Sequence, residues 1–145
     1  KQLDYAGTRG ADGSLQFAVP NPANGYALEW CDLLTAGIRT DTTATNGASL
    51  DCGLVPGTST GWSAYLQVFD LVGTNVIVTL EDSANNTDFA TFTSSAFTSA
   101  TADRTVQRIA GVAGSTVRRY VRAVSSGTFT SAPFIVALCR RPIGS

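Results

Sequence analysis

The chain has 145 residues, of which 43% are hydrophobic and 14% charged, and its net charge is −1. This composition is typical of one folded domain, and neither an apolar run long enough to cross a membrane nor a signal peptide is present, so we expect no membrane partner. Histidine, the commonest general base and metal ligand, is absent, and the serines stand in neither a nucleophile elbow nor a phosphate loop. We therefore expect no enzyme, no metal site and no cofactor.

Residues 1–45 are predicted to form an extended N-terminal arm, or the end of a preceding module. The segment VPNPANGY holds two prolines, which exclude a central strand. Before it, the run 14–19 alternates apolar and polar residues and places Leu15, Phe17 and Val19 on one face of a strand. That face is suited to pairing with the edge of another sheet, so we expect these three residues to contact a neighbouring subunit.

Residues 46–143 are predicted to form an antiparallel β-sandwich of about eight strands, of the jelly-roll or immunoglobulin-like type. Helix-forming residues are scarce, β-branched residues are plentiful, and short alternating runs are separated by glycine, serine and asparagine. We expect 63–72 to be the most central strand, because apolar and aromatic residues occupy both of its faces. The candidate strands of the whole chain are 14–19, 26–33, 48–54, 63–72, 75–82, 89–97, 104–111, 117–124 and 132–140.

The cysteines stand singly in the sequence. Cys31, Cys52 and Cys139 are each surrounded by apolar residues. Because no pair has C-x-x-C spacing, a zinc site is not expected. We predict three buried free thiols rather than a disulfide.

The acidic residues suggest two candidate sites, one for calcium binding and one for catalysis. For both we favour a structural role of the residues. The stretch LEDSANNTDF (80–89) offers oxygen ligands but lacks the order of a calcium loop, so we expect a hairpin loop whose side chains cap the backbone. Glu29 and Asp32 suggest a carboxylate pair for sugar hydrolysis, but strand alternation places them on opposite faces. Trp30 between them is expected in the core or as an interface anchor.

Charge is distributed unevenly along the chain. Residues 1–103 carry all eleven acidic residues and three basic ones, whereas residues 104–145 carry seven arginines and no acid. We favour the interpretation that strands from the two parts lie side by side and neutralise one another within the fold. The alternative is that unlike faces meet between copies in an assembly.

The segment VRRYVRAV (117–124) concentrates three of these arginines. On a strand, Arg118 and Arg122 share one face with Tyr120, and Arg119 interrupts the apolar face near an end. Arginine with almost no lysine suits ordered, bidentate contacts to carboxylates rather than a diffuse field for phosphates, so we expect no nucleic-acid recognition. Arg118, Arg119 and Arg122 are therefore predicted to contact acids on a neighbouring subunit.

Several sequence blocks, which include YLQVF, QRI, RRYVR and GTFT, stand here in an order that resembles a known family. The chain is similar to the C-terminal part of the major tail or tail-tube proteins of tailed bacteriophages that infect actinobacteria. The similarity extends over nearly the whole chain in several blocks. These blocks are Tyr65–Phe69, Gly73–Phe89, Gln107–Ile109, Arg118–Arg122, Gly127–Thr130 and Phe134–Arg140.

The resemblance implies a non-enzymatic structural protein of the virion, assembled in the host cytoplasm. Its partners would be copies of itself and other virion proteins, and the sandwich would be attached to a tube-forming module N-terminal to residue 1. The expected function is that of a tail-tube protein or of its surface-exposed sandwich domain.

Two alternatives remain open at the level of sequence. One is a capsid decoration protein. The other is a surface module that binds a host glycan during adsorption, with a site formed by the loops around Trp62 and around Asn85, Asn86 and Asp88.

Overall fold

The computed structural model describes residues 6–9, 15–18, 30–53, 61–112 and 114–140, the first two ranges without side chains. All regular structure in these residues is β-strand, which confirms the predicted all-β class. Val19 and Glu29, both named above, lie outside the described residues. The strands are β1 (Ala6–Arg9), β2 (Leu15–Ala18), β3 (Asp32–Leu33), β4 (Arg39–Asp41), β5 (Thr45–Asn46), β6 (Leu50–Asp51), β7 (Trp62–Val68), β8 (Val72–Ser83), β9 (Ala90–Ala96), β10 (Val106–Gly111) and β11 (Tyr120–Cys139).

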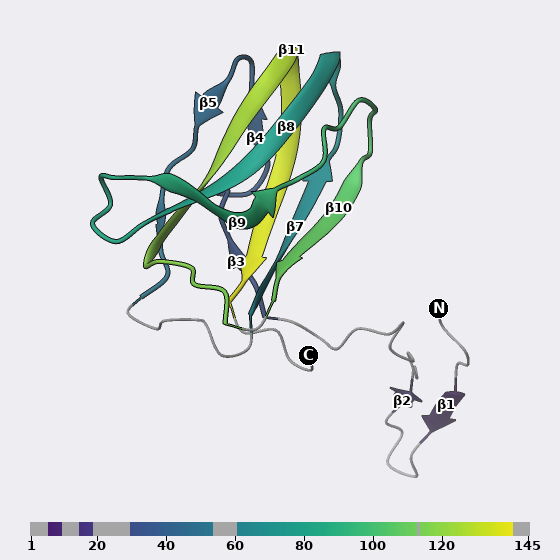
Figure 1. Cartoon of the computed structure of the whole chain (residues 1–145). Coiled ribbons are helices and arrows are strands. Elements are labelled where there is room, and N and C mark those ends of the chain that lie inside the picture. Colours follow the sequence, from purple (N-terminus) through teal and green to yellow (C-terminus); the bar gives the residue numbers. More distant parts are fainter. Residues whose placement is uncertain (1–5, 10–14, 19–29, 54–60, 113, 141–145) are drawn as a thin grey trace.

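The strands β3 to β11 form one antiparallel sheet around the long strand β11 (Figure 1). Its main path runs β10-β7-β11-β8-β9, and the short strands β3, β4, β5 and β6 all pair with the remaining edge of β11. The sheet curls until its end strands β9 and β10 lie close together, and the side chain of Gln107 donates a hydrogen bond to the carbonyl oxygen of Thr98 at 2.8 Å. The result is a sandwich that is almost closed into a barrel.

Strand β11 belongs to both halves of the sandwich. Residues 120–128 lie between β8 on one side and β5 and β6 on the other, whereas residues 132–139 lie between β7 and the pair β3 and β4. The register with β8 shifts on both sides of Phe129, which is how a strand bends from one sheet into another. Beside this bend Gly127 adopts a φ of +120°, and a Cβ there would lie 2.5 Å from the carbonyl oxygen of Asn75. Only glycine fits this position without displacing β8.

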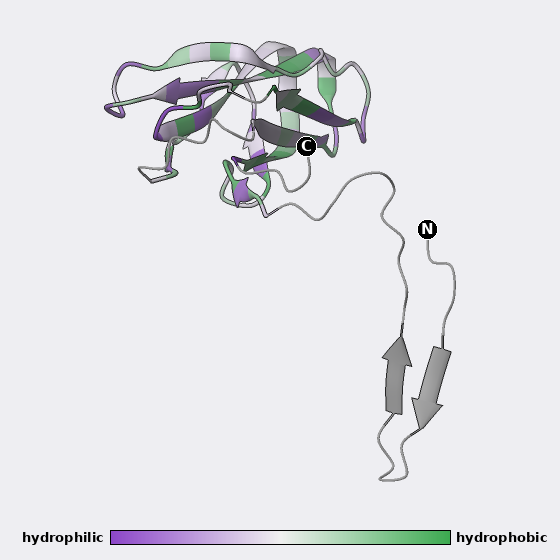
Figure 2. Ribbon diagram, turned by 60° about the horizontal axis from the view of Figure 1, so that its bottom comes forward, coloured by the Kyte–Doolittle hydropathy of each residue, from purple (hydrophilic) through white to green (hydrophobic). Residues whose placement is uncertain are grey.

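The core lies between the two halves and is built by alternation. The even-numbered residues of β7, the even-numbered residues Val76 to Asp82 of β8 and the even-numbered residues 132–138 of β11 point inward and are buried. Banding of hydrophobic and hydrophilic colour along the strands reflects this pattern (Figure 2). The largest fully buried side chains are Trp62, Phe134, Leu66, Leu80 and Leu138.

Most of the predicted strands occur, with two differences in their arrangement. Strands β7, β8, β9 and β10 fall within or close to the predicted runs, but 117–124 and 132–140 are parts of the single strand β11 rather than two strands. The most central strand is consequently β11, since the run 63–72 contributes β7, between β10 and β11. The prediction of two separate strands was wrong because SSGTFTSAP (125–133), which looks like a turn, continues the strand through its bend.

The N-terminal region is also partly different from expectation. Strands β1 and β2 form a separate two-stranded antiparallel sheet, with Phe17 opposite Gly7 and Leu15 opposite Arg9. Residues 32–41, which were assigned to the arm, are part of the main sheet through β3 and β4. The division into an arm or the end of a preceding module (1–45) and a sandwich domain (46–143) stays a prediction. Among the described residues no helix is long and apolar enough to cross a membrane.

Candidate interaction sites

Arg118 pairs with the most buried of the three carboxylates that bind the arginines of VRRYVRAV. Its Nε atom lies 2.6 Å from Oδ1 of Asp82, its backbone N–H donates to Oδ2 at 2.7 Å, and Nη2 donates to the Asp82 carbonyl oxygen at 2.9 Å. The Asp82 side chain is 3% exposed and that of Arg118 is 38% exposed. The arginine therefore satisfies a carboxylate on the inner face of β8, while part of the guanidinium group still reaches solvent.

Arg122 pairs with Glu81, which stands directly opposite on β8. Both Nε and Nη2 donate to Oε2 of Glu81, at 2.9 and 2.7 Å. On its other side the guanidinium carbon lies 4.1 Å from the centre of the Phe89 ring. This cross-strand pair is half-buried on the outer face of the sheet.

Arg119 pairs with Asp51 of β6 at the end of the sandwich. Its Nε and Nη2 atoms donate to the two carboxylate oxygens at 2.8 and 2.6 Å, and its guanidinium carbon lies 5.0 Å from the ring centre of Tyr120. These hydrogen bonds, followed by the one from the backbone N–H of Gly53, lower the pKa of Asp51 from 3.8 to about 2. The same contact with Asp51 raises the pKa of Arg119.

The three pairs confirm that the acidic and basic parts of the chain neutralise one another within the fold. The arginines come from the last third of the sequence, and their partners come from the first 103 residues. The expected bidentate geometry is present, but the carboxylates belong to the same chain. A contact of these arginines with a neighbouring subunit stays a prediction.

Arg39 and Asp41 form a buried polar cluster that the sequence analysis did not identify. The Arg39 Nη2 atom donates to Oδ2 of Asp41 at 2.7 Å, Nη1 donates to the carbonyl oxygen of Ala123 at 2.8 Å, and the guanidinium carbon lies 4.7 Å from the ring centre of Phe134. The buried hydroxyl of Ser125 donates to the same carboxylate oxygen. The cluster thus fastens β4 to both halves of β11. The i, i+2 spacing of Arg39 and Asp41 indicates that the two charges share one face of a strand and can pair. Their other partners, Ala123 and Ser125, are more than eighty residues away and could not be predicted from the sequence.

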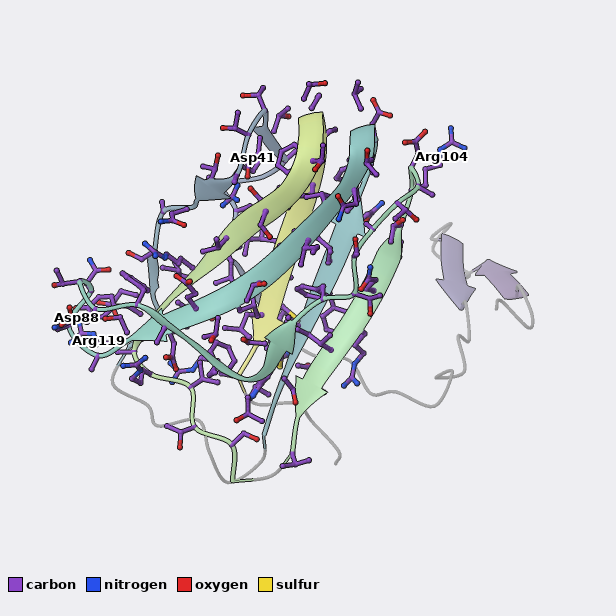
Figure 3. All side chains as sticks on the ribbon, turned by 45° about the horizontal axis from the view of Figure 1, so that its top comes forward. Asp41, Asp88, Arg104 and Arg119 are labelled. Atoms are coloured by element: carbon purple, nitrogen blue, oxygen red, sulfur yellow. The ribbon has the colours of Figure 1, made fainter. Side chains whose placement is uncertain are left out.

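Arg140 directly follows β11 and lies at the same end of the sandwich as Arg118 and Arg119, which directly precede it. It donates to the carbonyl oxygens of Val117 and Cys52, at 2.8 and 3.2 Å. These bonds join the segment that leads into β11 to the segment that follows β6. Figure 3 shows Arg119 and the loop of Asp88 at one end of the sandwich, with Asp41 and Arg104 towards the other end.

The structure contradicts the predicted role of Trp62 in a glycan site. Trp62 begins β7 and has an exposed fraction of 0%, with its ring 5.1 Å from the ring of Phe92 in an edge-to-face arrangement. Gly111 on β10 makes this possible, because a Cβ there would lie 2.0 Å from Nε1 of Trp62. An aromatic side chain packed in the core presents no face to a sugar, so Trp62 is a core residue.

The loop of Asn85, Asn86 and Asp88 is a hairpin loop between β8 and β9, as predicted. The side-chain oxygen of Asn85 accepts hydrogen bonds from the backbone N–H groups of Thr87 and Asp88, at 3.0 and 2.9 Å, and Asn86 has a φ of +63°. Asn85 Nδ2 also donates to Asp88 at 2.7 Å. The polar side chains of this loop are used to hold its own backbone. No cluster of metal-binding side chains occurs in the part of the chain that the structure describes.

The three cysteines lie in different environments. Cys139 is buried, Cys52 is half-buried, and Cys31 is exposed, so the prediction of three buried thiols was wrong for Cys31. Burial raises the pKa of the Cys52 thiol. Cys31 is exposed because it directly precedes the two-residue strand β3 at the edge of the sheet.

The segment 30–38 forms an exposed apolar edge, which we define as the side chains of Trp30, Leu33 and Ile38. Trp30 is 87% exposed, and the other two are more than half exposed. Leu33 lies on β3, whose pairing with β11 brings this segment to the margin of the sheet. Trp30 therefore does not lie in the core, and of the two predicted roles only that of an interface anchor is compatible with its position.

A groove of about 610 Å³ lies beside β9. Among its lining residues that the structure describes, Phe92 is the aromatic one and none is charged. We call this feature the β9 groove. Its lining residues are Thr91, Phe92, Thr93, Val112, Gly114, Ser115 and Thr116.

Comparisons with known proteins add no assignment to these features. The chain matches no protein-family model, no curated protein and no solved structure.

Proposed function

We propose that this chain is a non-enzymatic structural protein of a tailed-bacteriophage particle, either the tail-tube protein or its surface-exposed sandwich domain. The sequence blocks that resemble such proteins support the proposal, since YLQVF lies in and just after β7, and RRYVR and GTFT lie at the start and bend of β11. They would thus specify the framework of the domain rather than a catalytic centre. Copies of the chain and other virion proteins are the proposed partners.

The observation that carries the proposal is the exposed apolar edge. A tryptophan that is 87% exposed, with two further large apolar side chains within nine residues, is costly to leave in water unless another protein covers it. A sheet margin of this kind is also a template for contact with a neighbouring chain. In a particle built from many copies, this edge would be covered by the adjacent subunit.

Hydroxyl-radical footprinting of purified particles tests the proposal, because tryptophan oxidation reports solvent access. The chain should be found in the particles, and Trp30 should be oxidised several-fold less in intact particles than after their dissociation. Trp62, which is buried within the subunit, provides an internal control that should stay protected in both samples.

Absence of the chain from purified particles would overturn the proposal. If the chain is present but Trp30 is oxidised equally in both samples, the exposed apolar edge is not the subunit contact. Labelling of particles for electron microscopy separates a tail protein from a capsid decoration protein, since the label would decorate the tail or the head.

A further inference from the structure

The shape of the β9 groove shows that it runs along the edge of a strand. Successive side chains of a strand point to opposite faces, yet the consecutive residues Thr91, Phe92 and Thr93 all line the groove. Gly114, Ser115 and Thr116 are likewise consecutive and form the opposite wall. The groove is therefore a slot between two backbone segments rather than a hollow over a face of the sheet.

The edge of β9 that borders this slot lacks a strand partner among the described residues. β9 is the last strand of the sheet path and pairs only with β8, at Ala90, Thr91 and Ala96. An edge strand presents backbone N–H and C=O groups that a further extended chain can bind. The side-chain hydroxyls of Thr91, Thr93 and Thr116 also form no hydrogen bond within the described part of the chain.

The chemistry of the slot favours an uncharged extended peptide. None of the described residues that line it is charged, and the half-buried ring of Phe92 is held edge-to-face against Trp62. A strand in the slot would use its backbone along β9 and place an apolar side chain against Phe92.

The chain itself contains a strand of this description. The run SLQFAV (14–19) has no charge and alternates apolar residues, and its strand β2 belongs to a sheet of only two strands. An isolated two-stranded hairpin is marginally stable in water, so addition to another sheet would stabilise it. Among the described strands of one chain β2 pairs only with β1. The eleven residues 19–29 span at most about 36–40 Å, which sets the largest reach of the hairpin beyond its own sandwich.

We propose that strand β2 of one copy binds in the β9 groove of a second copy and extends its sheet by β-augmentation. This inference rests on the proposed role in a self-assembling particle and names the surfaces that meet there. Each copy then offers a strand at one end and a groove at another, which is a head-to-tail contact that closes into rings or continues as a filament.

Photo-cross-linking of the full-length chain tests the proposal. p-Benzoylphenylalanine replaces Phe17, equal amounts of ¹⁵N-labelled and unlabelled protein are mixed and irradiated, and the linked peptides are identified by mass spectrometry. Mixed-isotope links from position 17 to 91–93 or 112–116 are expected. Thr93→Lys, which places a charge in the slot, should reduce their yield about tenfold. Thr74→Lys is the matched control, because Thr74 is an exposed strand threonine outside the groove, and it should leave the yield unchanged.

Links confined to a single isotope would show that the hairpin folds onto its own chain, and they would overturn the proposal. Links to other surfaces, or no links at all, would also overturn the proposal. The same holds if Thr93→Lys and Thr74→Lys change the yield of mixed-isotope links equally. A groove that instead binds a glycan would give no mixed-isotope links and would bind soluble oligosaccharides. If the expected cross-links are missing but the chain is present in purified particles, only the proposed contact at the β9 groove is overturned. If the chain is absent from particles, the proposed structural role itself is overturned.

Discussion

Arg122 and Glu81 show how single residues of opposite charge hold neighbouring strands in register. The two face each other across β8 and β11, and the arginine also packs on Phe89. Pairs of this type contribute less than about 1 kcal/mol when exposed, and like charges placed opposite each other are unfavourable. Within one chain Arg122 thus pairs with Glu81, and we expect its substitution to lower the stability of the fold whether or not it also contacts a neighbouring subunit.

An exchange of the two charges is expected to be better tolerated than either single substitution. Arg122→Glu alone should lower the free energy of unfolding by about 1–2 kcal/mol, since it places two carboxylates opposite each other. The double variant Arg122→Glu with Glu81→Arg should recover most of that loss, as measured by urea denaturation. Arg104→Glu is the control, because Arg104 is exposed and makes no ion pair within the described residues, and it should have little effect. Equal destabilisation in the single and double variants would contradict a direct pair.

Asp51 makes a specific contribution to the dependence of stability on pH. Its pKa in the folded chain is about 2, below the ordinary value of 3.8, chiefly because Arg119 donates to the carboxylate. A group with a depressed folded-state pKa stabilises the fold above its unfolded pKa, and this stabilisation is lost as the pH falls through the folded value.

We expect the stability difference between the native chain and Asp51→Asn to be largest above about pH 4 and to shrink between pH 4 and pH 2. The asparagine side chain of the variant does not titrate. At each pH the free energy of unfolding is obtained from urea denaturation of both proteins, and the difference between the two values cancels the contributions of the other carboxylates. A difference that is constant from pH 5 to pH 2 would show that the Asp51 carboxylate does not depend on Arg119 in this way.

At the scale of elements, the bend of β11 is what joins the two halves of the sandwich. The strand passes from β8 to β7 through two register shifts, and Gly127 allows the close approach to Asn75. The bend therefore depends on a residue without a side chain rather than on a specific contact.

Gly127→Ala is expected to destabilise the fold by about 1–3 kcal/mol, since its Cβ would meet a backbone oxygen and its φ of +120° is unfavourable for any other residue. Ser126→Ala, at the adjacent exposed position, is the control and should change stability by no more than about 0.5 kcal/mol. Calorimetric melting of both variants gives the comparison. A melting temperature unchanged by Gly127→Ala would mean that β8 moves aside freely at this point.

The sequence predicted elements well where one face is buried and the alternation is regular, as in β7 and β8. It did not predict β4 and β5, and it placed β3 and β6 within the longer runs 26–33 and 48–54, because strands of two or three residues contain too little pattern and exist only through pairing with β11. Trp62 was misplaced because glycine and hydroxyl-bearing residues precede it, which is typical of a loop. That it packs in the core depends on Gly111, forty-nine residues later, and on Phe92.

At the scale of the whole molecule, neutralisation of charge within the fold could be predicted, whereas the identity of each pair could not. The uneven distribution of acids and arginines is visible in the sequence, but the partners of Arg118, Arg119 and Arg122 are 36 to 68 residues away. Pairing over such distances is determined by strand register. The β9 groove was also not predicted, since it arises only where a curled sheet stops short of closing.

Strand β11 follows all of its partner strands in the sequence, and this order has a consequence for biosynthesis. On the ribosome, residues 30–111 emerge before the strand that pairs with β3 to β8, so until then these segments lack their common partner. During this interval several strands of the nascent polypeptide have exposed edges, and such edges favour incorrect pairing and aggregation. Synthesis of β11 then supplies the partner strand of both halves, and a truncation before Ala132 would remove the residues that pair with β3, β4 and β7.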